Sequence, residues 1–310
     1  MKKNTLMKLI ALCTATMLTV AGCGSTSSTN TATENTSETT TVESTESVET
    51  TESIETSTTA EETEISVFIA ASLSGAMTEI ADLYNETHPE VTILYNADSS
   101  GTLMQQIEEG AACDIFFSAA TKQMNQLEND GYIVDGSRVD LLGNKVVLIT
   151  GKDSNTEVTG FDDLDKATNM ALADGSVPVG KYTRTILVNN GTLESTDDVS
   201  AITATEISEA LNGLEINECS NVSKVKEAVK EGSNEIGTVY FSDAYSVKDD
   251  VVILAEADTS LSGDIIYPVA LVTNDEATEA ELKAAADFLT FLQGEECLTI
   301  FENYMFIINE

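Results

Sequence analysis

The stretch ISVFIAASLSGAMTEIADLY, residues 65–84, contains the pattern that decides the fold. Residues 65–71 form an almost continuous apolar run, which is typical of a strand buried on both faces. The apolar residues that follow recur with the spacing of one helical face: Leu73, Ala76, Met77, Ile80, Ala81 and Tyr84. A buried strand that leads directly into a helix predicts an α/β protein.

The same alternation continues along the chain. Further strands are expected at residues 91–97, 114–119, 145–150, 169–173, 236–241, 251–255 and 265–272, and helices at residues 103–107, 121–129, 178–188, 222–231 and over most of 276–304. Buried strands that alternate with helices predict parallel sheets covered by helices on both faces. Ligands of such sheets bind beyond the carboxyl ends of the strands, so candidate site residues are sought there.

The N-terminus has the features of an export signal. Three lysines among the first eight residues precede an apolar run, residues 9–21, which is shorter than the ~20 residues of a membrane-spanning helix. The run ends in Val20-Ala21-Gly22-Cys23, which resembles a bacterial lipobox. Residues 1–22 are therefore predicted to be a lipoprotein signal peptide and Cys23 the lipid attachment site, which holds the protein on the outer face of the cell membrane. The alternative is an ordinary signal peptide with a chance cysteine.

Residues 23–64 consist almost entirely of Ser, Thr, Glu, Asn and Ala. Such a segment buries too little apolar surface to offset the entropy of ordering it. We expect an extended, negatively charged tether between the lipid and the folded part. A mucin-like stalk with its own role is the alternative.

Composition excludes some function classes. The formal net charge is −38 and the pI is about 4.1, which argues against nucleic-acid binding because that requires basic patches. An anion could still bind locally to neutral donors and helix termini. After removal of Cys13 and acylation of Cys23, an odd number of cysteines remains, without metal-like spacing: Cys113, Cys219 and Cys297. These three are expected to be buried free thiols.

Two serines follow the first two strands. Ser72 comes directly after the first strand, where its hydroxyl could cap a helix or donate to an anion held at the same helix end. Taken alone, the capping role is the better-supported one. Ser100 lies in Asp98-Ser99-Ser100-Gly101-Thr102 after the second strand, and its hydroxyl can point into a cleft, although a plain turn fits equally well.

Three further candidates lie in the second half of the chain. Val179 follows Pro178, which suits the first position of a helix and leaves the next amides free to face a ligand. Val222 begins another helix after Asn221, and Tyr240 ends a strand, where its phenol is either core or a donor to a ligand.

Catalytic and nucleotide-binding motifs are incomplete. The segment from Gly175 to Lys181 approaches the phosphate-loop pattern, but Tyr182 stands where Ser or Thr should hold magnesium. The Ser-x-x-Lys spacing at Ser223 lacks its partner motifs. His88, the single histidine, lies far from any plausible nucleophile. We therefore expect a binding protein rather than an enzyme, without a cofactor.

Seven short strings occur in one order along the folded part: Ala70-Ala71-Ser72-Leu73, Ser99-Ser100-Gly101-Thr102-Leu103 with Gln106-Ile107-Glu108-Glu109-Gly110-Ala111, Asp114-Ile115-Phe116-Phe117-Ser118-Ala119, Leu141-Leu142-Gly143-Asn144, Val177-Pro178-Val179-Gly180-Lys181-Tyr182, Gly237-Thr238-Val239-Tyr240-Phe241-Ser242-Asp243-Ala244 and Tyr267-Pro268-Val269-Ala270. Together they resemble the molybdate-binding subunit of ABC importers, in the type II periplasmic binding protein superfamily. The resemblance covers residues 65–308. Ala120 departs from it, because the family often has an acidic residue there.

The resemblance implies two α/β lobes that are joined by two crossings of the chain and close like a hinge on a tetrahedral oxyanion. Lobe 1 would comprise residues 65–143 and 266–310, and lobe 2 residues 144–265. The oxyanion-binding residues implied are Ser72, Ser100, Val179, Val222 and Tyr240, with Val222 in the least recognisable context. The implied ligand is molybdate or tungstate, so molybdenum would be bound only as the oxyanion. The implied partner is the ABC transporter permease, and the protein is expected to be a monomer.

Three other functions remain open on the sequence. The same cleft could capture another oxyanion such as sulfate. The Ser/Thr/Glu tether would also suit a surface adhesin, which would bind no small anion. An enzyme with Ser72 as nucleophile is disfavoured because no base accompanies the serine.

Overall fold

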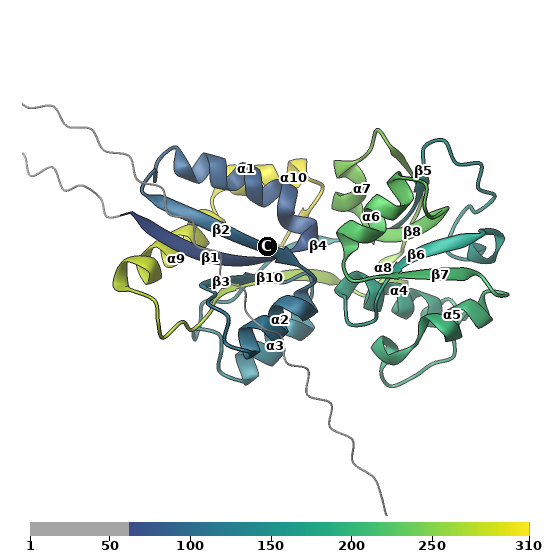
Figure 1. Cartoon of the computed structure of the whole chain (residues 1–310), viewed down its shortest axis with the longest axis horizontal. Helices are drawn as coiled ribbons and strands as arrows, with labels where there is room; N and C mark the ends of the chain where they lie inside the picture. The colour runs from purple at the N-terminus through teal and green to yellow at the C-terminus, as the bar shows by residue number, and fades with distance from the viewer. Residues whose placement is uncertain (1–61, 310) are drawn as a thin grey trace, which may run out of the picture. The chain divides into compact units, whose positions relative to one another are not determined.

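The computed structural model describes residues 62–309. These residues form two separate sheets with helices on both faces of each (Figure 1). One sheet has six strands in the order β11-β4-β10-β3-β1-β2, and the other has five in the order β7-β6-β8-β5-β9. We call the part of the chain built on the six-stranded sheet lobe 1 and the part built on the five-stranded sheet lobe 2. The predicted α/β class with two lobes is confirmed.

Lobe 1 contains the strands β1 (Thr63–Ala70), β2 (Val91–Asp98), β3 (Ile115–Phe117), β4 (Val139–Asn144), β10 (Ile265–Leu271) and β11 (Ile307–Ile308). The helices α1 (Ser74–Asn85) and α10 (Glu295–Asn303) cover one face of the sheet, and α2 (Ser100–Glu108) and α3 (Thr121–Asn129) cover the other (Figure 1). Helix α9 (Glu279–Phe291) packs on β1 and β10, and the 3-10 helix η1 (Ala71–Leu73) joins β1 to α1.

Lobe 2 contains β5 (Val146–Gly151), β6 (Asn169–Ala173), β7 (Glu215–Cys219), β8 (Ile236–Tyr240) and β9 (Val251–Glu256). Helices α6 (Val222–Lys230) and α7 (Phe241–Ser246) lie on one side of this sheet and α4 (Pro178–Asn189) and α5 (Ala204–Ala210) on the other (Figure 1). Helix α8 (Thr259–Ser262) contacts α4. The 3-10 helices η2 (Leu164–Lys166) and η3 (Val199–Ala201) complete the lobe.

The chain crosses between the sheets twice, between β4 and β5 and between β9 and β10. Asn144 and Ile265, which we expected in lobe 2, pair with each other in the sheet of lobe 1. At the N-terminal end, β1 already begins at Thr63, within the segment that composition assigned to the tether. The signal peptide, Cys23 and the rest of the tether lie outside the described residues.

Both sheets are mixed, which corrects the expectation of parallel sheets. β1 pairs in parallel with β2 and β3, but β10 is antiparallel to β3 and β4. In lobe 2, β6 is parallel to β7 and β8, whereas β5 is antiparallel to β8 and β9. The reason is the crossings: β10 and β5 each start where the chain enters a lobe, beside the end of a strand that runs the other way. An apolar run reports burial on both faces but not the strand's direction.

Most expected elements are present within a few residues of their predicted ends, and β6 and α3 have the predicted bounds. The sequence analysis missed β4, β7, β11, α5, α7, α8 and the three 3-10 helices. β7 escapes notice because it is an edge strand with one buried residue, Cys219. Helix α5 carries a detectable signal, the capping box between Thr203 and Glu206. Within residues 62–309, no helix combines the length and apolarity needed to cross a membrane.

The three cysteines of the described part are buried free thiols, as expected: Cys113, Cys219 and Cys297. Burial raises the pKa of the Cys297 thiol to about 12 and raises that of the Cys113 thiol further. Both thiols therefore stay protonated near neutral pH, which makes them poor nucleophiles.

Candidate functional site

A small cavity lies between the two lobes, and all five predicted site residues line it. Ser72 and Ser100 come from lobe 1, and Val179, Val222 and Tyr240 come from lobe 2. The remaining lining residues are Ala70, Ala71, Asp98, Ser99, Ala119, Val177 and Pro178. The cavity volume is about 10 Å³, far below the ~300–1,000 Å³ of pockets for drug-sized ligands. In this arrangement of the lobes the cavity has room for roughly one water molecule and excludes a sugar or a peptide.

Three helices begin at this cavity. Ser99 caps α2, where its side chain accepts a hydrogen bond from the amide of Thr102 at 3.1 Å. Val177 and Pro178 open α4, as the sequence predicted. The first amides of a helix have no partner inside the helix and lie at the positive end of its dipole. Together with α6, which starts at Val222, these helix ends make the cavity favourable for an anion.

Ser72 does not cap a helix, which corrects the role that the sequence alone favoured. It lies in the 3-10 helix η1, which has no side-chain cap, and its Oγ is 3.0 Å from the Oη of Tyr267. Asn144 Nδ2 lies 3.4 Å from the same Oη, and its orientation is fixed because Asn144 Oδ1 accepts from the amide of Lys145 at 2.9 Å. Since Asn144 donates to the phenol oxygen, Tyr267 can donate to Ser72, and the Ser72 proton can point into the cavity.

Ser100 is fully buried at the start of α2. Its Oγ accepts a hydrogen bond of 2.9 Å from the amide of Ala119, so its own proton is available to a ligand. Ala119 follows β3 and is a lining residue that our site prediction lacked. The signal was present, because Ala119 lies beyond the carboxyl end of the third strand, where ligands of α/β sheets bind.

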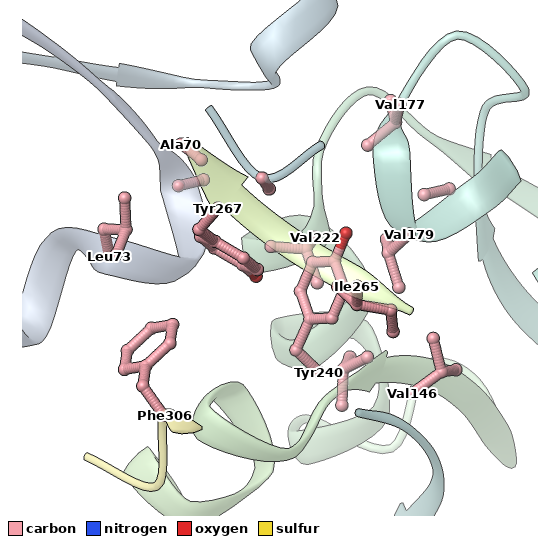
Figure 2. Close-up of a cluster of buried hydrophobic side chains, with 14 of the residues drawn as sticks. Ala70, Leu73, Val146, Val177, Val179, Val222, Tyr240, Ile265, Tyr267 and Phe306 are labelled. Carbon is pink, nitrogen blue, oxygen red and sulfur yellow. The ribbon is translucent and has the colours of Figure 1, made fainter. Parts of the chain in front are cut away.

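Tyr240 ends β8, is 1% exposed and faces the cavity. Its ring packs edge-to-face against Tyr267 at 5.5 Å and Tyr182 at 6.5 Å between ring centroids, and Figure 2 shows it below Val177 and Val179 and beside Tyr267. Its buried Oη has no hydrogen-bond partner within the described part of the chain. Burial raises the pKa of the phenol well above its ordinary value. The phenol therefore stays protonated. A hydrogen bond donated to a ligand would remove the free-energy cost of its unpaired, buried hydroxyl.

The charge of the cavity lining is unusual for an anion site. None of the lining residues is basic, and the single acidic one is Asp98. Asp98 Oδ1 accepts hydrogen bonds from the amide of Ser99 at 2.7 Å and from Asn221 Nδ2 at 3.0 Å. The cavity therefore offers hydroxyls, amides and helix ends rather than lysine or arginine. Residues 62–309 contain no cluster of three or more His, Cys, Asp or Glu side chains that could hold a metal ion.

Comparison with known proteins identifies the family. Residues 65–307 match the family model described as bacterial extracellular solute-binding protein. The chain belongs to this family. The resemblance recognised from the seven strings is thereby confirmed.

Named relatives are similar over most of the folded part of this solute-binding protein. The chain is 32% identical to YvgL of Bacillus subtilis (strain 168), and the alignment covers 79% of this chain and 87% of YvgL. The name of YvgL provisionally describes an ABC transporter substrate-binding lipoprotein. Over 80% of the chain it is 31% identical to the molybdate-binding protein ModA of Escherichia coli (strain K12), covering 91% of it. A solved structure titled as the substrate-binding domain of a provisionally assigned molybdenum ABC transporter from Clostridium difficile is 32% identical, with a TM-score of 0.57 over 80% of this chain and 100% of that one.

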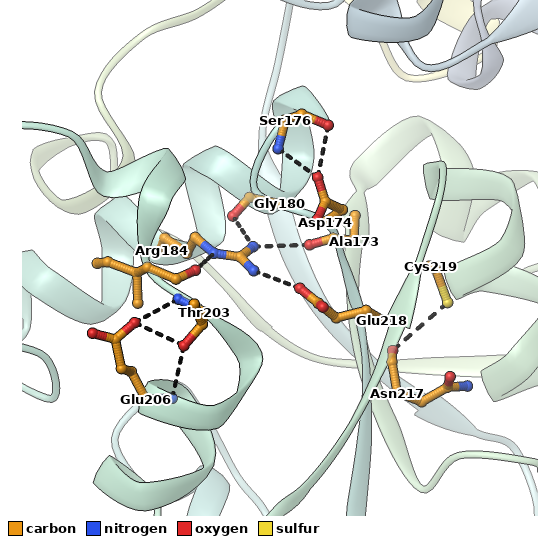
Figure 3. A network of polar contacts seen from close by, with 11 residues as sticks. Ala173, Asp174, Ser176, Gly180, Arg184, Thr203, Glu206, Asn217, Glu218 and Cys219 are labelled. Carbon is orange, nitrogen blue, oxygen red and sulfur yellow. Dashed lines mark hydrogen bonds and ion pairs between the residues drawn. The ribbon is translucent and has the colours of Figure 1, made fainter. Parts of the chain in front are cut away.

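Val177 and Val179 lie in the turn between β6 and α4 and in the first turn of α4. Hydrogen bonds from Arg184 stabilise this segment (Figure 3). The guanidinium is 1% exposed and donates to the carbonyls of Ala173 at 2.9 Å and Gly180 at 3.1 Å. It also pairs with Glu218 at 3.0 Å. Arg184 does not line the cavity; its hydrogen bonds fix both ends of the turn between β6 and α4. A Cβ at Gly180 would lie 2.2 Å from the carbonyl of Asp174, so this tight packing requires glycine.

Proposed function

We propose that the protein captures a tetrahedral oxyanion, molybdate or tungstate, in the cavity between the lobes and delivers it to an ABC importer. The observation that carries the proposal is the convergence of neutral donors on one small space between the lobes. Hydroxyls come from Ser72, Ser100 and Tyr240, and helix-start amides come from Val179 and Val222. The 31% identity to the molybdate-binding protein of Escherichia coli supports the choice of ligand.

Binding then rests on replacement of the hydration shell of the dianion. Each hydrogen bond to a charged group contributes ~1.5–3 kcal/mol net, so five or more donors can offset the cost of desolvation. None of the residues that line the cavity is a lysine or an arginine, so capture relies on preorganised dipoles and stays reversible when the lobes reopen. The size of the cavity must discriminate between molybdate and sulfate, because both ions present similar oxygens to the donors.

We further propose that the protein works outside the cytoplasm as a lipoprotein. The family is extracellular by description, and Cys23 in Val20-Ala21-Gly22-Cys23 is the proposed site of diacylation. The tether would let the two lobes reach the permease while the lipid stays in the membrane. Labelling of cells with a radioactive fatty acid tests this step: the protein should be labelled, and Cys23→Ala should abolish the label.

Thermal unfolding of the purified protein tests the ligand. Molybdate, tungstate, sulfate and phosphate are added separately at matched ionic strength. A ligand present at about 100 times its dissociation constant stabilises the folded state by ~2.7 kcal/mol, which raises the unfolding midpoint. A rise with molybdate and tungstate alone is expected. A larger rise with sulfate would change the substrate, and no rise with any of the four would favour a surface adhesin.

A further inference from the structure

Away from the chain crossings, where Asn144 donates to Ser242 at 2.9 Å, a second polar contact joins the two lobes beside the cavity. Asp98, the last residue of β2 in lobe 1, accepts a hydrogen bond of 3.0 Å from Asn221 Nδ2 in lobe 2. The two residues are 123 positions apart in the chain. Because each belongs to a different lobe, the hydrogen bond exists only while the lobes are together.

Both side chains are held in place from within their own lobes. Asp98 Oδ1 also accepts from the amide of Ser99 at 2.7 Å. Asn221 is the N-cap of α6, and its Oδ1 accepts from the amide of Lys224 at 3.0 Å. The cap bond fixes the orientation of the Asn221 amide, so its Nδ2 is directed at lobe 1. Neither side chain has to be reordered when the lobes meet, which reduces the entropic cost of the contact.

The position of Asp98 requires an explanation of its own. A carboxylate in the lining of an anion cavity opposes the binding of an anion, and here it is the single charged lining residue. A role in lobe closure explains why a carboxylate is present: a charged acceptor makes a stronger hydrogen bond than a neutral one. The neighbouring Val222 lines the cavity from the first turn of α6, so formation of the bridge also brings that helix start to the ligand.

We propose that Asp98 and Asn221 form a latch that stabilises the closed arrangement of the lobes. They are positioning residues: they set the population of closed protein, and the oxyanion is bound by the other lining residues. This inference rests on the proposed function for its ligand but not for its geometry. Since a closed population scales the affinity for every ligand of the cavity by the same factor, the latch affects affinity without affecting selectivity.

An exchange of the two side chains tests the latch. Asn221→Asp keeps the oxygen that caps α6 but places a second carboxylate against Asp98, so the lobes should repel each other. The double variant Asp98→Asn with Asn221→Asp restores a donor and an acceptor with exchanged roles. The matched control is Asn212→Asp: Asn212 Nδ2 donates to Asp165 Oδ2 at 2.8 Å, so the same change faces a carboxylate entirely within lobe 2.

Two quantities are measured on wild type and variants: the radius of gyration by X-ray scattering without added anion, and the dissociation constants for molybdate and tungstate. We expect Asn221→Asp to expand the anion-free protein and to raise both dissociation constants about tenfold, the effect of ~1.4 kcal/mol. The double variant should return to within roughly threefold of wild type, and Asn212→Asp should match wild type.

Three results would overturn the latch: an Asn221→Asp variant that behaves as wild type, a loss that the double variant does not rescue, or a different factor for each anion. If wild type binds none of the anions, the proposed function fails, and the scattering comparison of the same variants still decides whether the latch exists.

Discussion

At the scale of single residues, the site is a set of donors whose own hydrogen bonds leave one proton each for a ligand. Ser100 accepts from Ala119, and Ser72 contacts Tyr267, which in turn contacts Asn144. Among residues 62–309, the buried Oη of Tyr240 has no hydrogen-bond partner. The sequence placed each residue near a strand end or helix start, but the direction of these protons depends on Tyr267 and Asn144, which belong to other strands and could not be assigned from local sequence.

Tyr240→Phe should weaken binding of the oxyanion without loss of the fold. The change removes one hydrogen bond to a charged group, ~1.5–3 kcal/mol, which corresponds to a roughly 10- to 150-fold higher dissociation constant. The free energy of unfolding without anion should stay the same or rise, because the variant no longer buries an unpaired hydroxyl. Calorimetric titration and denaturant unfolding measure the two effects. Unchanged affinity would remove Tyr240 from the site.

The buried carboxyl of Asp243 should make the free energy of unfolding depend on pH. It is 2% exposed, and Lys226 Nζ is 3.9 Å from its Oδ1. Its Oδ2 has no hydrogen-bond partner in the part of the chain that the structure describes. Burial raises the pKa of Asp243 to about 6, although Lys226 acts in the opposite direction. Since the unfolded carboxyl has a pKa of about 3.9, the folded state binds more protons between these values, and the contribution of Asp243 to stability falls as the pH rises through that window.

Asp243→Asn should therefore be more stable than wild type above about pH 6, by a gain on the order of 3 kcal/mol, and the difference should vanish near pH 4. Lys226 keeps its hydrogen bond to Ser246 at 3.1 Å. Denaturant unfolding of both proteins from pH 4 to pH 8 measures the difference. A constant difference across this range would show that Asp243 does not titrate there.

At the scale of elements, the cavity is formed by ends of secondary structure rather than by their faces. The helix starts of α2, α4 and α6 meet there because β2, β6 and β7, the strands that precede them, all end at the gap between the sheets. Strand ends and helix caps have local signals such as Pro178 and Ser99, so this part of the site was predictable. The antiparallel strands were not, because an apolar run does not encode direction.

A substitution at Gly101 tests how closely α2 of lobe 1 must approach lobe 2. A Cβ at Gly101 in α2 would lie 3.0 Å from the carbonyl oxygen of Ser176 in lobe 2. Gly101→Ala should raise the helix propensity of α2 while it holds the lobes slightly apart. We expect a dissociation constant roughly 3- to 10-fold higher and no loss in the unfolding midpoint without anion.

Gly160→Ala is the matched control for Gly101→Ala, because its Cβ would meet Ala255 at an ordinary 3.9 Å within lobe 2. It should bind the anion as wild type does. Equal affinities of all three proteins would show that the contact between Gly101 and Ser176 does not limit closure.

At the scale of the whole molecule, two sheets joined by two crossings place residues from six separate parts of the chain around one space. Sequence patterns predicted the α/β class of each lobe. The family resemblance predicted that Ser72 and Ser100 face Tyr240 across one cavity. They did not reveal Ala119 as a lining residue or the bridge between Asp98 and Asn221. Ala119 had a signal, its place beyond the carboxyl end of a strand, but the bridge exists only after both lobes have folded and met, so neither composition nor periodicity contains a signal for it.

A crystal structure of the protein with molybdate, with diffraction data collected at the molybdenum absorption edge, tests the central claim most directly. We expect one strong anomalous peak in the cavity, with oxygens of the ion within hydrogen-bond distance of Ser72, Ser100 and Tyr240 and of the amides of Val179 and Val222. An anomalous peak elsewhere on the molecule, or no peak in crystals grown with excess molybdate, would contradict the account.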